Sequence, residues 1–220
     1  MERLEKLRNC LEIAICSCFI ASIFFYGSQY AYLHTQFDFC TNDPIWFFMV
    51  QAFSGILAVI IPYHLRKKGK LFLSPLLYSL YLLFLFASLF LGELCHFYLL
   101  ISGWDSLLHF TSGILLFFVF FEWIRGLQIK ESSSIPFSLI LAVCCSLAVG
   151  SIWEIYEFIS DGVFHTNMQR FLDIQGNAFF GRYALLDTMS DLIFGFLGSI
   201  LGGVYYIYTQ KYKDKSKNSI

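Results

Sequence analysis

The sequence has little charge. Only 14% of its 220 residues are Asp, Glu, Lys or Arg, whereas 57% are hydrophobic and 20% are aromatic. A soluble globule of this size needs more polar residues to cover its surface. The composition therefore excludes an ordinary water-soluble domain and indicates an integral membrane protein.

The sequence also lacks the signatures of several other classes. It has no glycine-rich nucleotide-binding loop, no internal repeat and no alternating pattern of a β-barrel. Its seven cysteines show no metal-binding spacing and lie mostly in apolar runs, where cysteine behaves as a small hydrophobe. We therefore expect no nucleic-acid partner and no redox centre. The sequence leaves open whether Cys40 and Cys95, both near one expected membrane face, form a disulfide.

Six apolar runs are long enough to cross a bilayer. A helix needs about 20 apolar residues to span the hydrocarbon, and without a barrel pattern only helices satisfy the backbone there. The sequence predicts an all-α bundle of six transmembrane helices, a single domain over residues 1–220 that lies in the lipid bilayer. The runs cover approximately residues 10–33, 45–64, 72–95, 104–125, 136–159 and 187–209.

The basic residues predict the orientation of the bundle. Of the 15 Lys and Arg residues, 13 flank the spans on the side that carries both termini. Only Arg170 and Arg182 fall on the opposite side, and basic residues mark the cytoplasmic side of a membrane protein. We expect cytoplasmic N- and C-termini, with the first apolar run kept as an anchor, since it is too long for a signal peptide.

The longest connection joins the fifth span to the sixth and covers residues 160–186. It carries amide and acidic side chains among aromatic residues. Long connections in compact proteins often have functional roles. We expect this one to fold over the outer face as a lid.

Acidic and histidine residues recur at helical spacing near the expected outer ends of the last four spans. Residues three or four apart share one face of a helix, so each group should form a stripe. Because an ionisable side chain exposed to lipid costs a few kcal/mol or more, the stripes should face one another inside the bundle. In the last span, three glycines predict close helix packing: Gly195, Gly198 and Gly202. The groups are Glu93 and His96; Asp105 and His109; Glu154, Glu157 and Asp161; and Asp187 and Asp191.

The stripes have an excess of negative charge. They hold seven acids and two histidines, and no Lys or Arg is embedded beside them. Two carboxylates about 4 Å apart repel by roughly 4 kcal/mol at an effective dielectric constant of 20, so the acids cannot all be ionised together. Protons, water, a bound metal ion, or an arginine of the long loop, Arg170 or Arg182, must offset this charge.

Several of these residues also have a purely structural interpretation. Asp105 and Asp187 stand where helix caps and first-turn acids belong. Asp161 can be solvated at its helix end, and Glu93 with His96 can form an interfacial pair. The other four lie at least one turn inside their spans, which favours a functional role: His109, Glu154, Glu157 and Asp191.

Three ordered motifs carry a resemblance to a known family. They are WDSLLHFTSG, then WEIYEFISD followed by NMQ, then LLDTMSDLIFGFLG. Over approximately residues 70–205 the chain resembles the YjdF-like family of predicted bacterial inner-membrane proteins, and more distantly the VanZ-like family, which includes a glycopeptide-resistance accessory protein. The first resemblance implies a multi-pass bacterial cell-membrane protein without an established reaction. The matching positions are Asp105, His109, Glu154, Glu157, Asp161, Asp187 and Asp191.

Two classes of function stay open. The first is a binding, transport or accessory protein whose polar cluster near the outer face takes a cation, protons or a small envelope-related ligand. The second is a metal-dependent membrane enzyme, in which a divalent ion activates water against a lipid or cell-envelope substrate. The ligands expected for such an ion are Glu93, His96, His109, Glu154, Glu157 and Asp191.

Overall fold

The computed structural model describes residues 2–33, 45–69, 73–127, 134–173 and 175–217, and it confirms an all-α membrane bundle. The chain is 85% helical and has no strands in these ranges. Six of its helices are long and apolar enough to cross a membrane, as predicted. Cys40 lies outside the described residues, so the structure does not test its pairing with Cys95.

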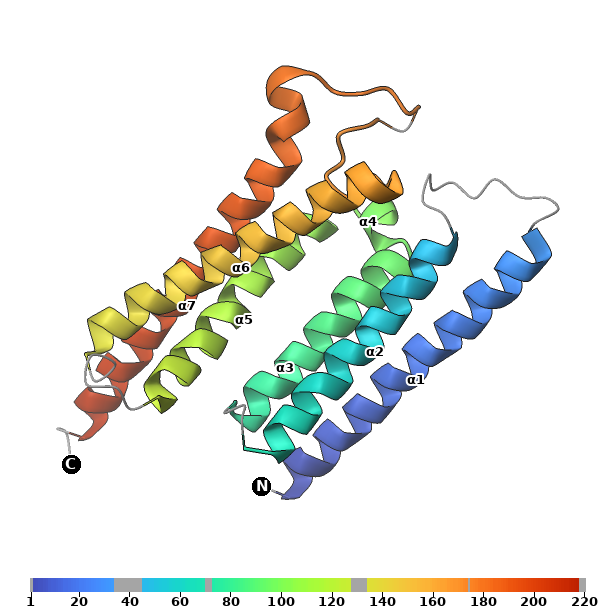
Figure 1. Ribbon diagram of the computed structural model, residues 1–220. Helices are drawn as coiled ribbons and strands as arrows, with labels where there is room; N and C mark the ends of the chain where they lie inside the picture. The colour runs from blue at the N-terminus through green and yellow to red at the C-terminus, as the bar shows by residue number, and fades with distance from the viewer. Residues whose placement is uncertain (1, 34–44, 70–72, 128–133, 174, 218–220) are drawn as a thin grey trace.

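The first and last helices place both termini at the same end of the bundle (Figure 1). We call the opposite end, where the connection between the last two spans lies, the distal end. That this end faces the outside of the cell stays a prediction. The spans are α1 (Glu2–Leu33), α2 (Ile45–Lys67), α3 (Pro75–Leu85) with the π-helix η1 (Phe86–Leu94), α5 (Trp104–Gly126), α6 (Ile135–Phe164) and α7 (Leu186–Lys217). The short helix α4 (Phe97–Leu100) follows η1, and the 3-10 helix η3 (Gly181–Leu185) precedes α7.

The third span differs from the regular helix that the sequence predicts. It changes to a π-helix at Phe86 and ends at Leu94, where the carbonyl oxygen accepts a hydrogen bond of 2.7 Å from the Tyr26 hydroxyl. His96 follows with a left-handed backbone, φ 58°, and precedes α4. The prediction that Glu93 and His96 share one helical face is therefore wrong, because the helix ends between these two residues.

The fifth span continues further than predicted. Helix α6 ends at Phe164 rather than near residue 159, and His165 follows in a left-handed conformation. Asp161 therefore lies inside the helix, as its predicted stripe with Glu154 and Glu157 requires. The distal connection before η3 covers residues 165–180, so it is shorter than the predicted segment 160–186.

The spans pack as two groups, one of α1, α2 and α3 with η1 and the other of α5, α6 and α7 (Figure 1). Phe19 and Tyr78 lie in the buried core of the group formed by α1, α2 and α3 with η1. Phe117 lies in the core between α5 and α6, in the group that α7 completes. Near the terminal end, Glu122 Oε2 of α5 accepts a hydrogen bond of 2.8 Å from the backbone N–H of Ser74, the residue that caps α3. This bond links the two groups.

Glycines bring α5 and α7 into close contact. A Cβ atom at Gly113 would overlap the carbonyl oxygen of Gly195, and one at Gly198 would overlap that of Phe110. A Cβ at Gly202 would lie 2.8 Å from the Phe117 ring. Small residues allow such an approach between membrane helices. The close packing predicted for the last span is therefore present, and it fixes the residues of α5 and α7 relative to each other.

Candidate functional site

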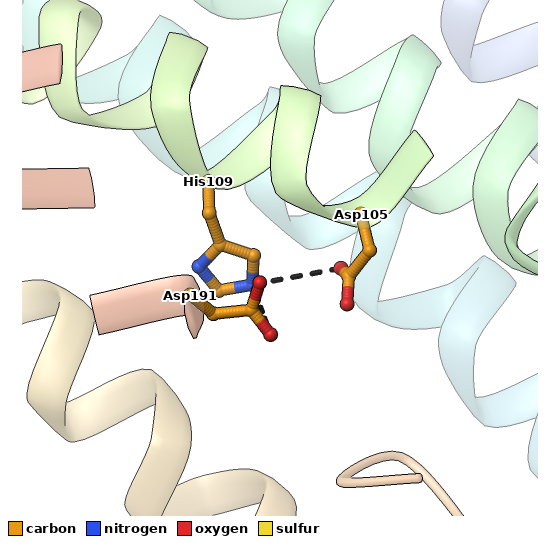
Figure 2. Close-up of side chains that lie close together, drawn as sticks. All are labelled: Asp105, His109 and Asp191. Atoms are coloured by element: carbon orange, nitrogen blue, oxygen red, sulfur yellow. Dashed lines mark ion pairs between the residues drawn. The ribbon is translucent and has the colours of Figure 1, made fainter. Parts of the chain in front are cut away.

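The imidazole of His109 lies among three carboxylates near the distal end of the bundle. Its Nε2 atom is 3.6 Å from Asp105 Oδ1, one turn earlier on α5. The same atom is 3.9 Å from Glu154 Oε1 of α6 and 3.9 Å from Asp191 Oδ2 of α7. Figure 2 shows the side chains of Asp105 and Asp191 directed toward the imidazole. All three helices of the second group therefore contribute to one cluster, as the convergence of the stripes predicted.

The carboxylates of this cluster are deeply buried. The side chain of Asp191 is 2% exposed and that of Glu154 is 6% exposed. Among the described residues, the Glu154 oxygens and the Oδ2 atoms of Asp187 and Asp191 are buried without a well-formed hydrogen bond, although Thr188 and Gln169 lie close to Glu154. A buried polar atom without a partner costs about 1–3 kcal/mol, and more when it is charged. Water, a proton or a cation has to satisfy these oxygens.

The spacing of the side chains suits a shared cation better than direct hydrogen bonds. One ligand atom from each of Asp105, His109 and Asp191 can be chosen so that all three lie within 4.8 Å of one another. The contacts of His109 Nε2, at 3.6 and 3.9 Å, are longer than an N–H···O hydrogen bond. A tetrahedral ion with bonds of about 2.1 Å holds its ligands roughly 3.4 Å apart. A small contraction of the cluster would bring these three atoms to the spacing of ligands around one ion.

Arg170 brings one positive charge to the distal edge of the cluster. Its Nη2 atom is 3.2 Å from Asp105 Oδ2, and its Nη1 atom is 3.5 Å from Asp187 Oδ1. The guanidinium also lies 5.9 Å from the centre of the Tyr98 ring. Burial acts to lower the pKa of Arg170, but the carboxylates of Asp105 and Asp187 outweigh it and raise the pKa above its ordinary value. Arg170 is therefore the loop arginine that folds in, whereas Arg182 in η3 is exposed.

Asp161 holds the distal connection in place. Its Oδ1 atom accepts hydrogen bonds of 2.7 Å from both the Thr166 hydroxyl and the Met168 backbone N–H. Its Oδ2 atom accepts one of 3.0 Å from the backbone N–H of Gln169. The Gln169 side chain in turn donates to the Thr188 hydroxyl at 3.0 Å. Asp161 thus anchors the chain immediately before Arg170, a role that its place at a helix end did not indicate.

The remaining predicted site residues make other contacts. Glu157 Oε1 accepts a hydrogen bond of 2.7 Å from Trp153 Nε1 on the same helix. The ring of His96 packs edge-on against Phe48 of α2, with ring centres 5.3 Å apart. Glu93 lies in η1, within the first group of helices. The residues that the structure brings together are Asp105, His109, Glu154, Asp187 and Asp191, with Arg170.

A small cavity adjoins the cluster between α5, α6 and α7. His109 and Asp191 line it, together with Ser112, Ser146 and Gly150. Its volume is about 10 Å³, which is close to the space needed for one water molecule. A water there would have polar partners in the site itself.

The comparison with known families places these residues in context. The sequence profile described as "Predicted membrane protein (DUF2238)" matches residues 43–212. This chain belongs to the DUF2238 family. The match confirms the predicted YjdF-like resemblance, since the two names refer to the same family. The matched part of this DUF2238 protein includes every residue of the cluster.

A relative of this DUF2238 protein comes from Thermotoga maritima. An "Uncharacterized protein" of Thermotoga maritima is 31% identical over 109 residues, which are 49% of this chain and 50% of the relative. The chain thus aligns with about half the length of that relative. No solved structure matches the chain.

Proposed function

We propose that this DUF2238 protein binds a divalent cation at its distal cluster. The ligands are Asp105, His109 and Asp191, with Glu154 as the fourth. The observation that carries the proposal is the burial of the Glu154 and Asp191 carboxylate oxygens beside three possible ligand atoms that lie within 4.8 Å of one another. A bound cation would satisfy these oxygens and relieve the repulsion among the acids.

The charges of the cluster favour a divalent ion. The cluster holds four carboxylates and one guanidinium, so ionised acids leave three negative charges without compensation. A divalent ion and one proton would balance them, whereas a monovalent ion would leave more protons to be taken up. Two or three carboxylates with one imidazole form a mixed oxygen and nitrogen ligand set, which suits Zn²⁺ or Mn²⁺.

The location of the site follows from the predicted topology. With 13 basic residues on the terminal side, the distal end faces the outside of a bacterial cell membrane. We infer that the cation reaches the cluster from the envelope side, past the connection over residues 165–180. A ligand of the envelope would approach the same face.

The cavity beside His109 and Asp191 favours hydrolysis as a second candidate function. Catalytic zinc sites keep one coordination position for water, and the bound ion lowers the pKa of that water. The cavity would place one water next to two of the ligands. In this version Glu154 would accept the proton of the water instead of being the fourth ligand, and the substrate would be a lipid or another envelope component.

Metal analysis of the detergent-purified full-length protein tests the proposal. The protein is loaded with Zn²⁺ or Mn²⁺, desalted and analysed for bound metal, alongside His109→Asn and the matched control His96→Asn. We expect about one ion per chain in the wild type and in the control, and less in His109→Asn. A folded wild type that retains neither ion would overturn the proposal, as would equal metal contents in the two variants.

A further inference from the structure

Asp105 connects the cluster to Arg170. One of its oxygens, Oδ1, faces His109 at 3.6 Å, on the side of the proposed ion. The other oxygen, Oδ2, lies 3.2 Å from the guanidinium of Arg170. Asp187 holds the same guanidinium from α7 at 3.5 Å. The arginine therefore shares a carboxylate with the cation site.

Arg170 also lies between the cluster and the solvent. Its side chain is 37% exposed, compared with 12% for His109 and 2% for Asp191. Asp187, its second carboxylate partner, is 18% exposed. Exposure thus falls from the guanidinium to the centre of the cluster. An ion that arrives from the distal side meets the charge of Arg170 before it reaches the buried ligands.

The contacts that anchor the connection are separate from those of the guanidinium. Asp161 holds the backbone N–H groups of Met168 and Gln169. The Gln169 side chain donates to Thr188. None of these bonds uses the Arg170 side chain, so the guanidinium can leave Asp105 while the loop stays in place.

We propose that Arg170 is a resident cation that competes with the incoming ion and sets the affinity of the site. The inference rests on the proposed cation site. In the ion-free protein the guanidinium offsets the charge of Asp105 and Asp187. When the ion binds, it repels Arg170 and takes a larger share of Asp105. Arg170 thereby limits the site to ions whose charge can outweigh its own.

The repulsion is large enough to measure. Even in the dielectric of bulk water, a single and a double positive charge about 6 Å apart repel by roughly 1.4 kcal/mol, a factor of ten in affinity. The effect inside a protein is larger because the effective dielectric constant is lower. Removal of the Arg170 charge should therefore tighten cation binding at least about tenfold.

The test is a titration of the full-length protein in detergent with Zn²⁺ or Mn²⁺, followed by calorimetry. Arg170→Gln removes the charge at the cluster, and Arg182→Gln removes the same charge from an exposed position in η3. Arg170→Lys keeps the charge but loses the two-pronged geometry of the guanidinium. We expect at least about tenfold tighter binding in Arg170→Gln, and affinities close to the wild type in Arg182→Gln and Arg170→Lys.

Three results would overturn the inference. Binding by Arg170→Gln at or below the wild-type affinity would show that the arginine does not compete. Equal tightening in Arg182→Gln would indicate a general effect of net charge, and equal tightening in Arg170→Lys would indicate lost contacts. These results differ from failure of the cation site itself, in which no variant binds either ion.

Discussion

His109 Nε2 of α5 and Asp191 Oδ2 of α7 lie 3.9 Å apart, although 82 positions separate them in the chain (Figure 2). The close packing of the two helices makes this contact possible. Gly113, one turn below His109, faces the carbonyl oxygen of Gly195, one turn below Asp191. The distances between the side chains of the cluster therefore depend on two glycines that are not part of the cluster.

The substitution Gly113→Ala should destabilise the protein. The new Cβ would overlap the Gly195 carbonyl oxygen, so α5 and α7 would have to separate. Overpacking of this kind typically costs about 1–3 kcal/mol. We expect a lower midpoint of thermal unfolding in detergent, together with weaker binding of Zn²⁺.

Gly162→Ala is the matched control for this substitution. A Cβ at Gly162 of α6 would meet no heavy atom within 4 Å, and alanine favours a helix over glycine. Its unfolding midpoint should equal or exceed that of the wild type. If Gly113→Ala were as stable as Gly162→Ala, the glycine contact would not be what sets the distance between α5 and α7.

The substitution Asp161→Ala should release the distal connection. It removes the acceptor for Thr166, Met168 and Gln169, and each hydrogen bond to a charged group contributes about 1.5–3 kcal/mol. The loss of only one such bond would make local opening at least roughly ten times more frequent. The backbone amides of this segment would then exchange faster by the same factor. Hydrogen–deuterium exchange read by mass spectrometry should show this increase over residues 166–170.

Asp173→Ala serves as the comparison within the same connection. Asp173 accepts solvent-exposed hydrogen bonds from Gln175 and Asn177 and therefore stabilises only its own turn. Its removal should speed exchange near residues 175–177 and leave residues 166–170 unchanged. Identical exchange profiles for Asp161→Ala and Asp173→Ala would refute the anchoring role of Asp161.

The predicted orientation can be tested at the distal connection. Gln175 is exposed, so a cysteine placed there in a cysteine-free variant should react with a membrane-impermeant maleimide added to intact cells. A cysteine at residue 215, next to the C-terminus, should react only after the cells are opened. The reverse pattern would place the cluster on the cytoplasmic side.

Much of the fold and part of the cluster could be predicted from the sequence. The apolar runs predict the six spans because a bilayer requires about 20 apolar residues per helix. His109, Glu154 and Asp191 converge because ionisable groups are costly in lipid, which leaves the bundle interior as their place. In both cases the sequence pattern and the surrounding lipid are enough to predict where these residues lie.

Other features depend on contacts that the sequence pattern does not contain. The π-helix η1 replaces regular helix at Phe86, and the span ends before His96, so helical spacing no longer relates His96 to Glu93. Arg170 rather than Arg182 reaches the cluster, because Asp161 binds the backbone N–H groups of the two residues before Arg170. Only the assembled structure reveals these relationships.

The proposal that His109 and its neighbouring carboxylates bind a cation is tested most directly by X-ray absorption at the zinc edge. The measurement uses the full-length protein loaded with one equivalent of Zn²⁺, beside His109→Asn. We predict nitrogen and oxygen ligands at about 2.0–2.2 Å, including one imidazole that is absent in His109→Asn. Zinc without an imidazole ligand, zinc with sulfur ligands at about 2.3 Å, or a spectrum unchanged in His109→Asn would contradict the proposed site.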